Sequence, residues 1–301
     1  MPSCFISHTW HEGQHHFAMR LATVLKKKGI EVQIDEKIIF PGDPIKETIE
    51  RGMKHKSDVF LFVMSPEALK SEMCKYELKL ALNQMEEHGK PIIPVVFKEC
   101  EIPSFLRNIY YADFRNPLYF DAAVERLVEG IKRSAKIRQI CLELNHPNPD
   151  KRIEISKKLW DLKNPLALGP LKNRLLFEES DPIVKYWLAI AIGEIGGKRA
   201  IDILRQAMEE TNPFAQLGVI EAMIEVFESL DKKEFTQRLK VLSEAINSDN
   251  PNRRLCAVKI LVGLKRKSDQ IQSMLCNLEN DPNNDIQSII KEYFKGKRRM
   301  L

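Results

Sequence analysis

Glu77 is the side chain whose sequence context singles it out for chemistry. If it lies on a helix, its neighbours three and four residues away are all uncharged: Met73, Cys74, Leu80 and Ala81. Glu77 therefore lacks the ion pair that usually supports a surface carboxylate, whereas Glu72 has Lys75 within helical reach. Such a carboxylate is a candidate functional acid. The alternative is a solvated acid beside an apolar stripe, and spacing alone leaves both interpretations open.

Four of the seven histidines also lie close together, at positions 8, 11, 15 and 16. His11 and His15 are spaced to share one face of a helix, as metal ligands often do. No cysteine or second histidine cluster completes a ligand set. We therefore expect surface or helix-start histidines and no metal site.

Phosphate-binding glycine loops are missing from the sequence. Neither GxxxxGK[ST] nor GxGxxG occurs, and Gly193, Gly196 and Gly197 do not follow an expected strand. These absences argue against a nucleotide kinase, an ATPase or a Rossmann dehydrogenase.

The first part of the chain alternates between strand and helix patterns. Expected strands cover residues 4–7, 30–34, 58–63, 92–97 and 110–114, and the third and fourth are apolar enough for burial on both faces. Helical spacing between them ends at Gly29 and near Gly89, which suit C-terminal caps. This order predicts a parallel sheet covered by helices. Ligands in such sheets bind beyond the carboxyl ends of the strands, here after Ser7, Ile34 and Met64.

Beyond about residue 133 the strand patterns stop and a helical repeat begins. Five Asn-Pro or Asp-Pro pairs are expected to open helices, with the first residue as N-cap; they are Asn148-Pro149, Asp181-Pro182, Asn212-Pro213, Asn250-Pro251 and Asp281-Pro282. Successive prolines are 33, 31, 38 and 31 residues apart, which is typical of paired helical repeats. Stretches such as residues 184–197 and 200–208 resemble HEAT repeats, although the spacing is shorter than in that class. We predict an α/β domain over residues 1–136 and an all-α, HEAT-like solenoid over residues 137–301.

The length of 301 residues and the hydrophobic fraction of 44% fit two domains with sizeable cores. No apolar run approaches the roughly 20 residues that span a bilayer, and the first residues lack the basic start of a signal peptide. The six cysteines are scattered without short spacings, as expected for reduced thiols. We therefore expect a cytoplasmic protein without membrane contact.

The net charge of +5 owes much to the last residues of the chain, which are rich in lysine and arginine. So short a basic tail is more typical of a solvated helix end than of a nucleic-acid site. We do not expect a nucleic-acid partner. If nucleic acid did bind, binding would weaken steeply with salt and disappear when residues 291–301 are deleted.

Five motifs in register resemble those of the TIR domain, over roughly residues 2–135. They are Phe5-Ile-Ser-His8, the segment 35–42 followed by Ile45 and Ile49, the segment 57–65, Ser71-x-x-Cys74-x-x-Glu77-Leu78 and Ile92-Ile-Pro-Val95. The resemblance implies a flavodoxin-like fold with a parallel sheet. Many TIR domains have Trp where this chain has Met73.

The TIR resemblance further implies an NAD+ nucleohydrolase that cleaves the bond between nicotinamide and ribose, with NAD+ as substrate and no other cofactor. Nicotinamide leaves as a neutral ring, so positive charge develops on the ribose, as in glycoside hydrolysis. Glu77 is then expected to hold the ribose hydroxyls and stabilise that charge. The resemblance assigns substrate binding to Ser7, His8, Thr9, Trp10, Asp35, Gly42 and Cys74. Trp10 is expected to stack on a ring of the dinucleotide or to serve in packing.

The rival interpretation is a non-enzymatic TIR scaffold that signals by assembling with other TIR domains. A glutamate at position 77 favours the enzyme, because a scaffold needs no particular residue there. In either case we expect self-association through the TIR domain and a signalling or defence role. The repeats are expected to bind an unidentified protein or ligand as a sensing or assembly module.

Overall fold

The computed structural model describes residues 1–34, 57–107, 109–266 and 268–298. The chain forms two compact units, Met1–Leu142 and Glu143–Leu301. The last helix of the first unit is α5 (Phe120–Leu142). The domain boundary predicted between residues 136 and 137 falls within this helix, and it stays a prediction.

A five-stranded parallel sheet forms the centre of the first unit. Its strands are β1 (Ser3–Ser7), β2 (Glu31–Ile34), β3 (Val59–Met64), β4 (Ile92–Val96) and β5 (Ala112–Asp113). The strand order β2-β1-β3-β4-β5 is the flavodoxin-like arrangement. The structure therefore confirms the predicted α/β fold, with strand ends displaced by one or two residues.

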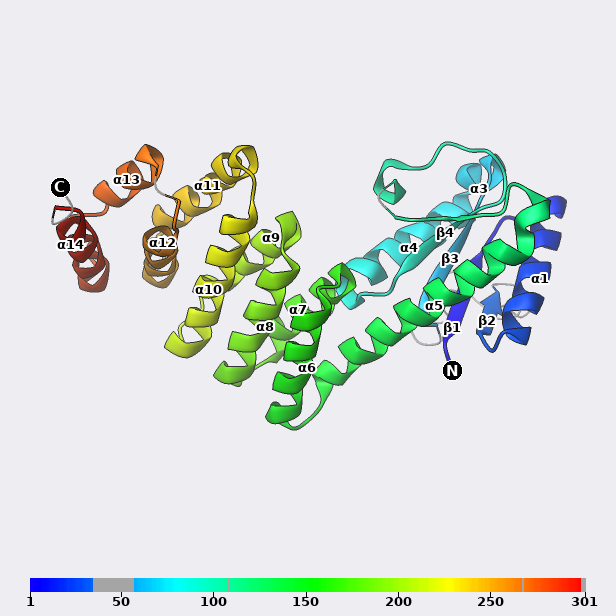
Figure 1. The fold of residues 1–301 in the computed structure, drawn as a ribbon, viewed down its shortest axis with the longest axis horizontal. Helices are drawn as coiled ribbons and strands as arrows, with labels where there is room; N and C mark the ends of the chain where they lie inside the picture. The colour runs from blue at the N-terminus through cyan, green and yellow to red at the C-terminus, as the bar shows by residue number, and fades with distance from the viewer. Residues whose placement is uncertain (35–56, 108, 267, 299–301) are drawn as a thin grey trace. The chain divides into compact units, whose positions relative to one another are not determined.

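Helices cover both faces of this sheet (Figure 1). Helix α1 (Glu12–Lys27) and α5 pack on one face, in a core with Cys4, Ile6 and Leu61. Helices α3 (Pro66–Lys70) and α4 (Glu72–His88) belong to the other face, whose core includes Phe5 and Phe60. Successive residues of β1 and β3 thus point into different cores, which explains why these strands are apolar at nearly every position.

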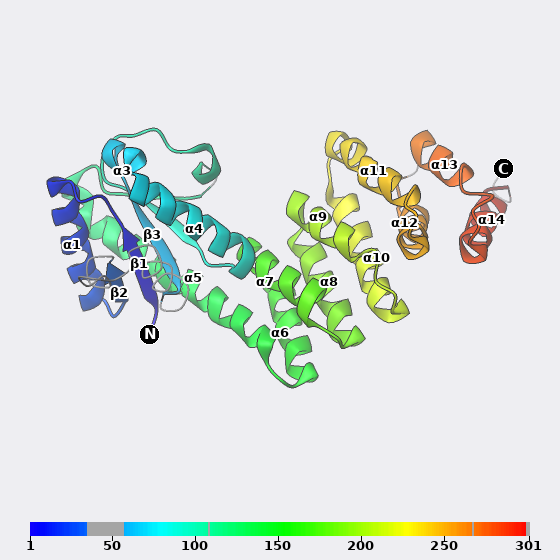
Figure 2. The ribbon, with the colours of Figure 1, turned by 180° about the vertical axis from the view of Figure 1, so that it is seen from behind.

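The second unit is built of helices in sequential pairs (Figure 2). The first helices of the pairs are α6 (Pro149–Leu162), α8 (Pro182–Ile195), α10 (Pro213–Ser229), α12 (Pro251–Gly263) and α14 (Asn284–Arg298). The second helices are α7 (Leu168–Asn173), α9 (Gly197–Ala207), α11 (Lys232–Ile246) and α13 (Asp269–Cys276). A π-helical turn, Arg174–Glu178, follows α7. The predicted all-α repeat architecture is confirmed, and the basic tail continues α14, with residues 299–301 outside the described range.

Four of the five predicted helix starts are confirmed. The side chains of Asn148, Asp181, Asn212 and Asn250 cap helices that have Pro at the first position. The fifth prediction, at Asp281-Pro282, is wrong because α14 begins at Asn284. Asp281 pairs with Arg254, and Asn283 instead accepts hydrogen bonds from the first backbone N–H groups of α14.

A ladder of ion pairs connects successive repeats. In three repeats, a cationic residue four positions after the helix cap binds an acid that lies two positions before the next cap. The pairs are Arg152 with Glu179, Lys185 with Glu210 and Arg254 with Asp281, at 2.8, 2.5 and 2.8 Å. In the remaining repeat the cationic position is Gln216 and the acidic position is Ser248. At this junction both charged partners are therefore replaced by uncharged residues.

Candidate active site

Helix α4 carries Glu77 on the face that packs against the sheet. The Ser71 hydroxyl caps this helix by accepting a hydrogen bond from the Cys74 backbone N–H at 3.3 Å. Cys74 and Leu78 pack into the core with Phe5 and Phe60, so their helix face is buried. Glu77 lies on the same face and is 0% exposed. A solvated surface acid, the alternative left open by the sequence, is therefore wrong.

The Glu77 carboxylate meets the end of the central strand β1. The Ser7 hydroxyl donates a hydrogen bond to Glu77 Oε2 at 2.5 Å, and both residues are completely buried. Ser7 is the last residue of β1, and Ser7 pairs with Phe62 of β3. This contact places the carboxylate at the carboxyl edge of the sheet, the edge at which ligands bind in such folds.

His8 extends this buried polar region towards helix α1. His8 is 2% exposed, and its Nε2 lies 3.1 Å from Nδ1 of His15. Burial, reinforced by the nearby His15, lowers the pKa of His8 from 6.5 to about 4. His8 is therefore neutral at physiological pH, so it brings no positive charge next to Ser7 and Glu77.

The loop that follows β1 carries the residues expected to face a dinucleotide. Thr9 is half-buried, whereas Trp10 is 64% exposed. The Trp10 ring stacks on His15 with centroids 5.9 Å apart and planes 8° from parallel. Trp10 thus presents an open aromatic surface near the carboxyl edge, which suits stacking on a ring of a ligand.

The remaining predicted binding residues are placed differently. Cys74 is 1% exposed and contributes to the core on the side of α4. Asp35 and Gly42 lie outside the described residues. Among the described residues, no three His, Cys, Asp or Glu side chains are arranged to hold a metal ion.

Two polar residues of this edge were missed by the sequence analysis. Gln14 is 1% exposed; its amide donates to the Val63 carbonyl at 2.7 Å and accepts from the Ser65 hydroxyl at 2.7 Å. The Ser65 hydroxyl also caps α3 through the Ala68 N–H. A signal was available, because Gln14 precedes Ala18 and Leu21 at helical spacing and so lies on the apolar face of α1.

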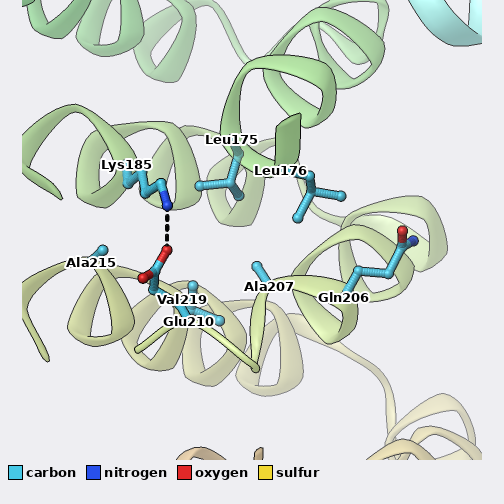
Figure 3. Close-up of a pocket in the computed structure, with 8 residues that line it drawn as sticks. All are labelled: Leu175, Leu176, Lys185, Gln206, Ala207, Glu210, Ala215 and Val219. Atoms are coloured by element: carbon cyan, nitrogen blue, oxygen red, sulfur yellow. Dashed lines mark hydrogen bonds and ion pairs between the residues drawn. The ribbon is translucent and has the colours of Figure 1, made fainter. Parts of the chain in front are cut away.

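The second unit contains a cavity of about 140 Å³ between repeats (Figure 3). Its lining residues are Leu175, Leu176, Lys185, Gln206, Ala207, Glu210, Ala215 and Val219. The charged pair in its wall, Lys185 with Glu210, is a member of the ion-pair ladder. We therefore attribute the cavity to the packing of adjacent repeats against each other.

Family models match both parts of the chain. A TIR domain model matches residues 4–128, and a HEAT repeat model matches residues 137–224. Among the helices of the described residues, none combines the length and apolar composition needed to cross a bilayer.

One curated relative, named NAD(+) hydrolase PdTIR, comes from Paracoccus denitrificans (strain Pd 1222). It is 35% identical over 104 residues, which are 34% of this chain and 34% of the relative. The match thus spans about a third of the relative's length.

Two solved structures are also similar to this chain. The TIR domain of the Toll-related receptor TRR-2 from Hydra magnipapillata is 23% identical, covers 43% of this chain and 97% of its own, and has a TM-score of 0.38. The complex of CpcE and CpcF of phycocyanin lyase from Nostoc sp. PCC7120 is 17% identical, covers 53% of this chain and 98% of its own, and has a TM-score of 0.39.

Proposed function

We propose that this chain, which carries a TIR domain over residues 4–128 followed by HEAT repeats over residues 137–224, cleaves NAD+ into nicotinamide and ADP-ribose. The observation that carries the proposal is the buried Glu77 carboxylate at the carboxyl edge of the sheet, held by Ser7. The printed name of the Paracoccus denitrificans relative, an NAD(+) hydrolase, supports the same chemistry.

The proposed reaction breaks the bond between the nicotinamide nitrogen and C1′ of the ribose. The bonding electron pair leaves with nicotinamide, and positive charge develops on the ribose ring. The Glu77 carboxylate stabilises that charge, and water adds at C1′ and loses a proton to give ADP-ribose. Little solvent surrounds Glu77, so a fixed negative charge there is worth more than it would be in water.

The substrate must reach a carboxylate that is fully buried in the described conformation. Glu77 is 0% exposed, so a change of conformation has to make its carboxylate accessible before the ribose makes contact. The exposed Trp10 is then positioned to stack on a ring of the dinucleotide. His8, Thr9 and Cys74 are proposed to line the site, together with Asp35 and Gly42, which lie outside the described residues.

The burial of Glu77 also favours a second candidate function, a non-enzymatic scaffold. A scaffold would act through TIR–TIR assembly, and its buried glutamate would have a structural role, such as accepting the hydrogen bond of the Ser7 hydroxyl. In both cases we place the protein in the cytoplasm, in a signalling or defence response. The repeats would act as the sensing or assembly module and bind a partner of their own.

Glu77→Gln distinguishes the two functions because it keeps the size of the side chain and removes its charge. Loss of one preorganised stabilising group of this kind costs about 10²–10³-fold in rate. The measurement is nicotinamide release from NAD+ by chromatography, with circular dichroism to confirm folding. Glu72→Gln is the matched control, because Glu72 lies on the same helix, is exposed and pairs with Lys75 at 2.7 Å.

The enzyme and the scaffold predict different results for these two variants. We expect Glu77→Gln to fold and to release almost no nicotinamide while Glu72→Gln stays active. Equal consumption of NAD+ by both variants would remove Glu77 from the mechanism. A parent protein that consumes no NAD+ under assembled conditions would favour the scaffold.

A further inference from the structure

Ser7 and Glu77 form a buried hydrogen-bonded pair between two elements that are distant in the sequence. The hydroxyl at the end of β1 donates to Oε2 of a carboxylate on α4, at 2.5 Å and 70 residues away. Neither residue has any exposed surface. The hydroxyl therefore faces the carboxylate from inside the protein, and neither group meets solvent in the described conformation.

The Ser7 backbone pairs with strand β3. Strand β1 lies between β2 and β3, and its pairing with β3 extends to Ser7 and Phe62. The hydroxyl is thus attached to a residue of an inner strand of the sheet. A donor fixed in this way restricts the rotamer of its acceptor, which is how a supporting residue preorganises a reacting group.

We propose that Ser7 is the positioning residue of Glu77: its hydroxyl orients the carboxylate and keeps it ionised, and Ser7 does not contact the dinucleotide. This inference rests on the proposed NAD+ cleavage and replaces the substrate-binding role that the sequence predicted for Ser7. A hydrogen bond donated to a carboxylate stabilises its ionised form. Removing the hydroxyl should therefore favour protonation of Glu77 and free its side chain.

Ser3 provides a matched control at the opposite end of the same strand. It is also a buried serine, and its hydroxyl donates to a carboxylate, Asp58 Oδ2, at 2.8 Å. Ser3→Ala therefore removes the same chemical group from the same strand, but at the edge away from Glu77. Any general effect of losing a buried hydroxyl on stability should appear in both variants.

The experiment follows the Glu77 carboxyl by ¹³C NMR across a pH titration of the full chain, with the signal assigned through Glu77→Gln. We expect Ser7→Ala to raise the titration midpoint by about one pH unit, and Ser3→Ala to leave it unchanged. Ser7→Thr keeps a hydroxyl in a side chain suited to a strand and should restore the parent midpoint. If Ser7→Ala does not fold, Ser7→Cys, with a weak thiol donor, should still raise the midpoint.

Kinetics supply the second readout. A positioning residue that does not touch the substrate should lower kcat by about 10-fold and change KM by less than about twofold. The acid limb of the rate profile should move to higher pH in Ser7→Ala, and Ser7→Thr should reverse both effects. An unchanged carboxyl midpoint in Ser7→Ala would overturn the inference, as would a raised KM with unchanged kcat. A parent without activity would end the proposed function, and the titration would still decide whether Ser7 controls Glu77.

Discussion

Lys90 is a buried amine at the amino edge of the sheet, opposite the candidate site. It is 1% exposed, and its Nζ donates to the Ser57 hydroxyl at 2.6 Å. Burial lowers its pKa from 10.5 to about 7; the charge of Arg138 adds to this effect and Asp58 opposes it. The folded protein therefore gives up the Lys90 proton more readily than the unfolded chain does.

This difference predicts how stability changes with pH. Between pH 7 and the unfolded pKa of 10.5, the unfolded chain binds more protons at Lys90, so the free energy of unfolding should rise with pH. We expect Lys90→Met to flatten that rise between about pH 7 and 9 in urea denaturation, since no titrating amine remains. The exposed Lys75 is the control, and an equal slope in parent, Lys90→Met and Lys75→Met would contradict the assignment.

Met73 leads to a prediction about the reaction product. It is half-buried against the core on the side of α4, four residues before Glu77. A thioether offers no flat surface on which adenine could fold back towards the ribose. We expect the parent to form mainly linear ADP-ribose and Met73→Trp to raise the cyclic share, as measured by chromatography. A dominant cyclic product from the parent would refute this prediction.

The sequence pointed to Glu77, but it could not show how the residue is held. The uncharged helical neighbours and the TIR-like spacing were local signals. The contact with Ser7 joins residues 70 positions apart, and the Ser3–Asp58 contact joins residues 55 apart. Such pairs form only when strands and helices pack, so spacing along the chain does not reveal them.

At the scale of the elements, helix starts were predictable wherever the cap residue acts locally. Asn148, Asp181, Asn212 and Asn250 each bond to N–H groups in the first turn of their own helix. Asp281 has the same local sequence, but Arg254 of the preceding repeat binds its carboxylate. That contact is long-range, so the displaced start of α14 could not be deduced from the Asp-Pro pair.

The most buried ion pair of the ladder, Arg152 with Glu179, leads to a prediction about the stability of the repeats. Glu179 has a fully buried side chain and binds Arg152 and Arg174, both at 2.8 Å. Glu179→Gln leaves these two guanidinium groups without their carboxylate, so we expect a loss of about 3 kcal/mol in the free energy of unfolding. Glu154→Gln, in the exposed pair with Lys151, should cost no more than about 0.5 kcal/mol.

The stability that Glu179 contributes should depend on pH. Burial by itself raises the pKa of Glu179, but hydrogen bonds from Arg152, Arg174 and the Asp181 backbone outweigh it and hold the pKa at about 2. Because the unfolded value is 4.5, this contribution is complete above pH 4.5 and is lost as the pH falls towards 2. The difference between parent and Glu179→Gln should therefore shrink from pH 7 to pH 3. A constant difference over that range would show that the carboxylate charge is not what stabilises the repeats.

At the scale of the whole molecule, several large apolar side chains of the first unit lie on its surface and not in its core. They include Leu118 at 89%, Tyr110 at 84%, Tyr119 at 66%, Trp10 at 64% and Phe105 at 50% exposure. Where such side chains lie together, they favour association between chains. Glu77, in contrast, is closed off within the single chain. Association can activate the site only if it favours a conformation in which the carboxylate is accessible.

We therefore predict that specific activity increases with protein concentration and follows self-association. The measurement is nicotinamide release per chain over a dilution series, with the association state of each sample determined by analytical ultracentrifugation. Leu118→Glu places a charge next to the exposed Tyr119 and should reduce both association and activity without lowering the melting temperature. Phe177→Glu is the control, because Phe177 is 73% exposed but lies in the second unit. Constant turnover from a dilute monomer would contradict the prediction, since it would mean that a single chain opens its own site.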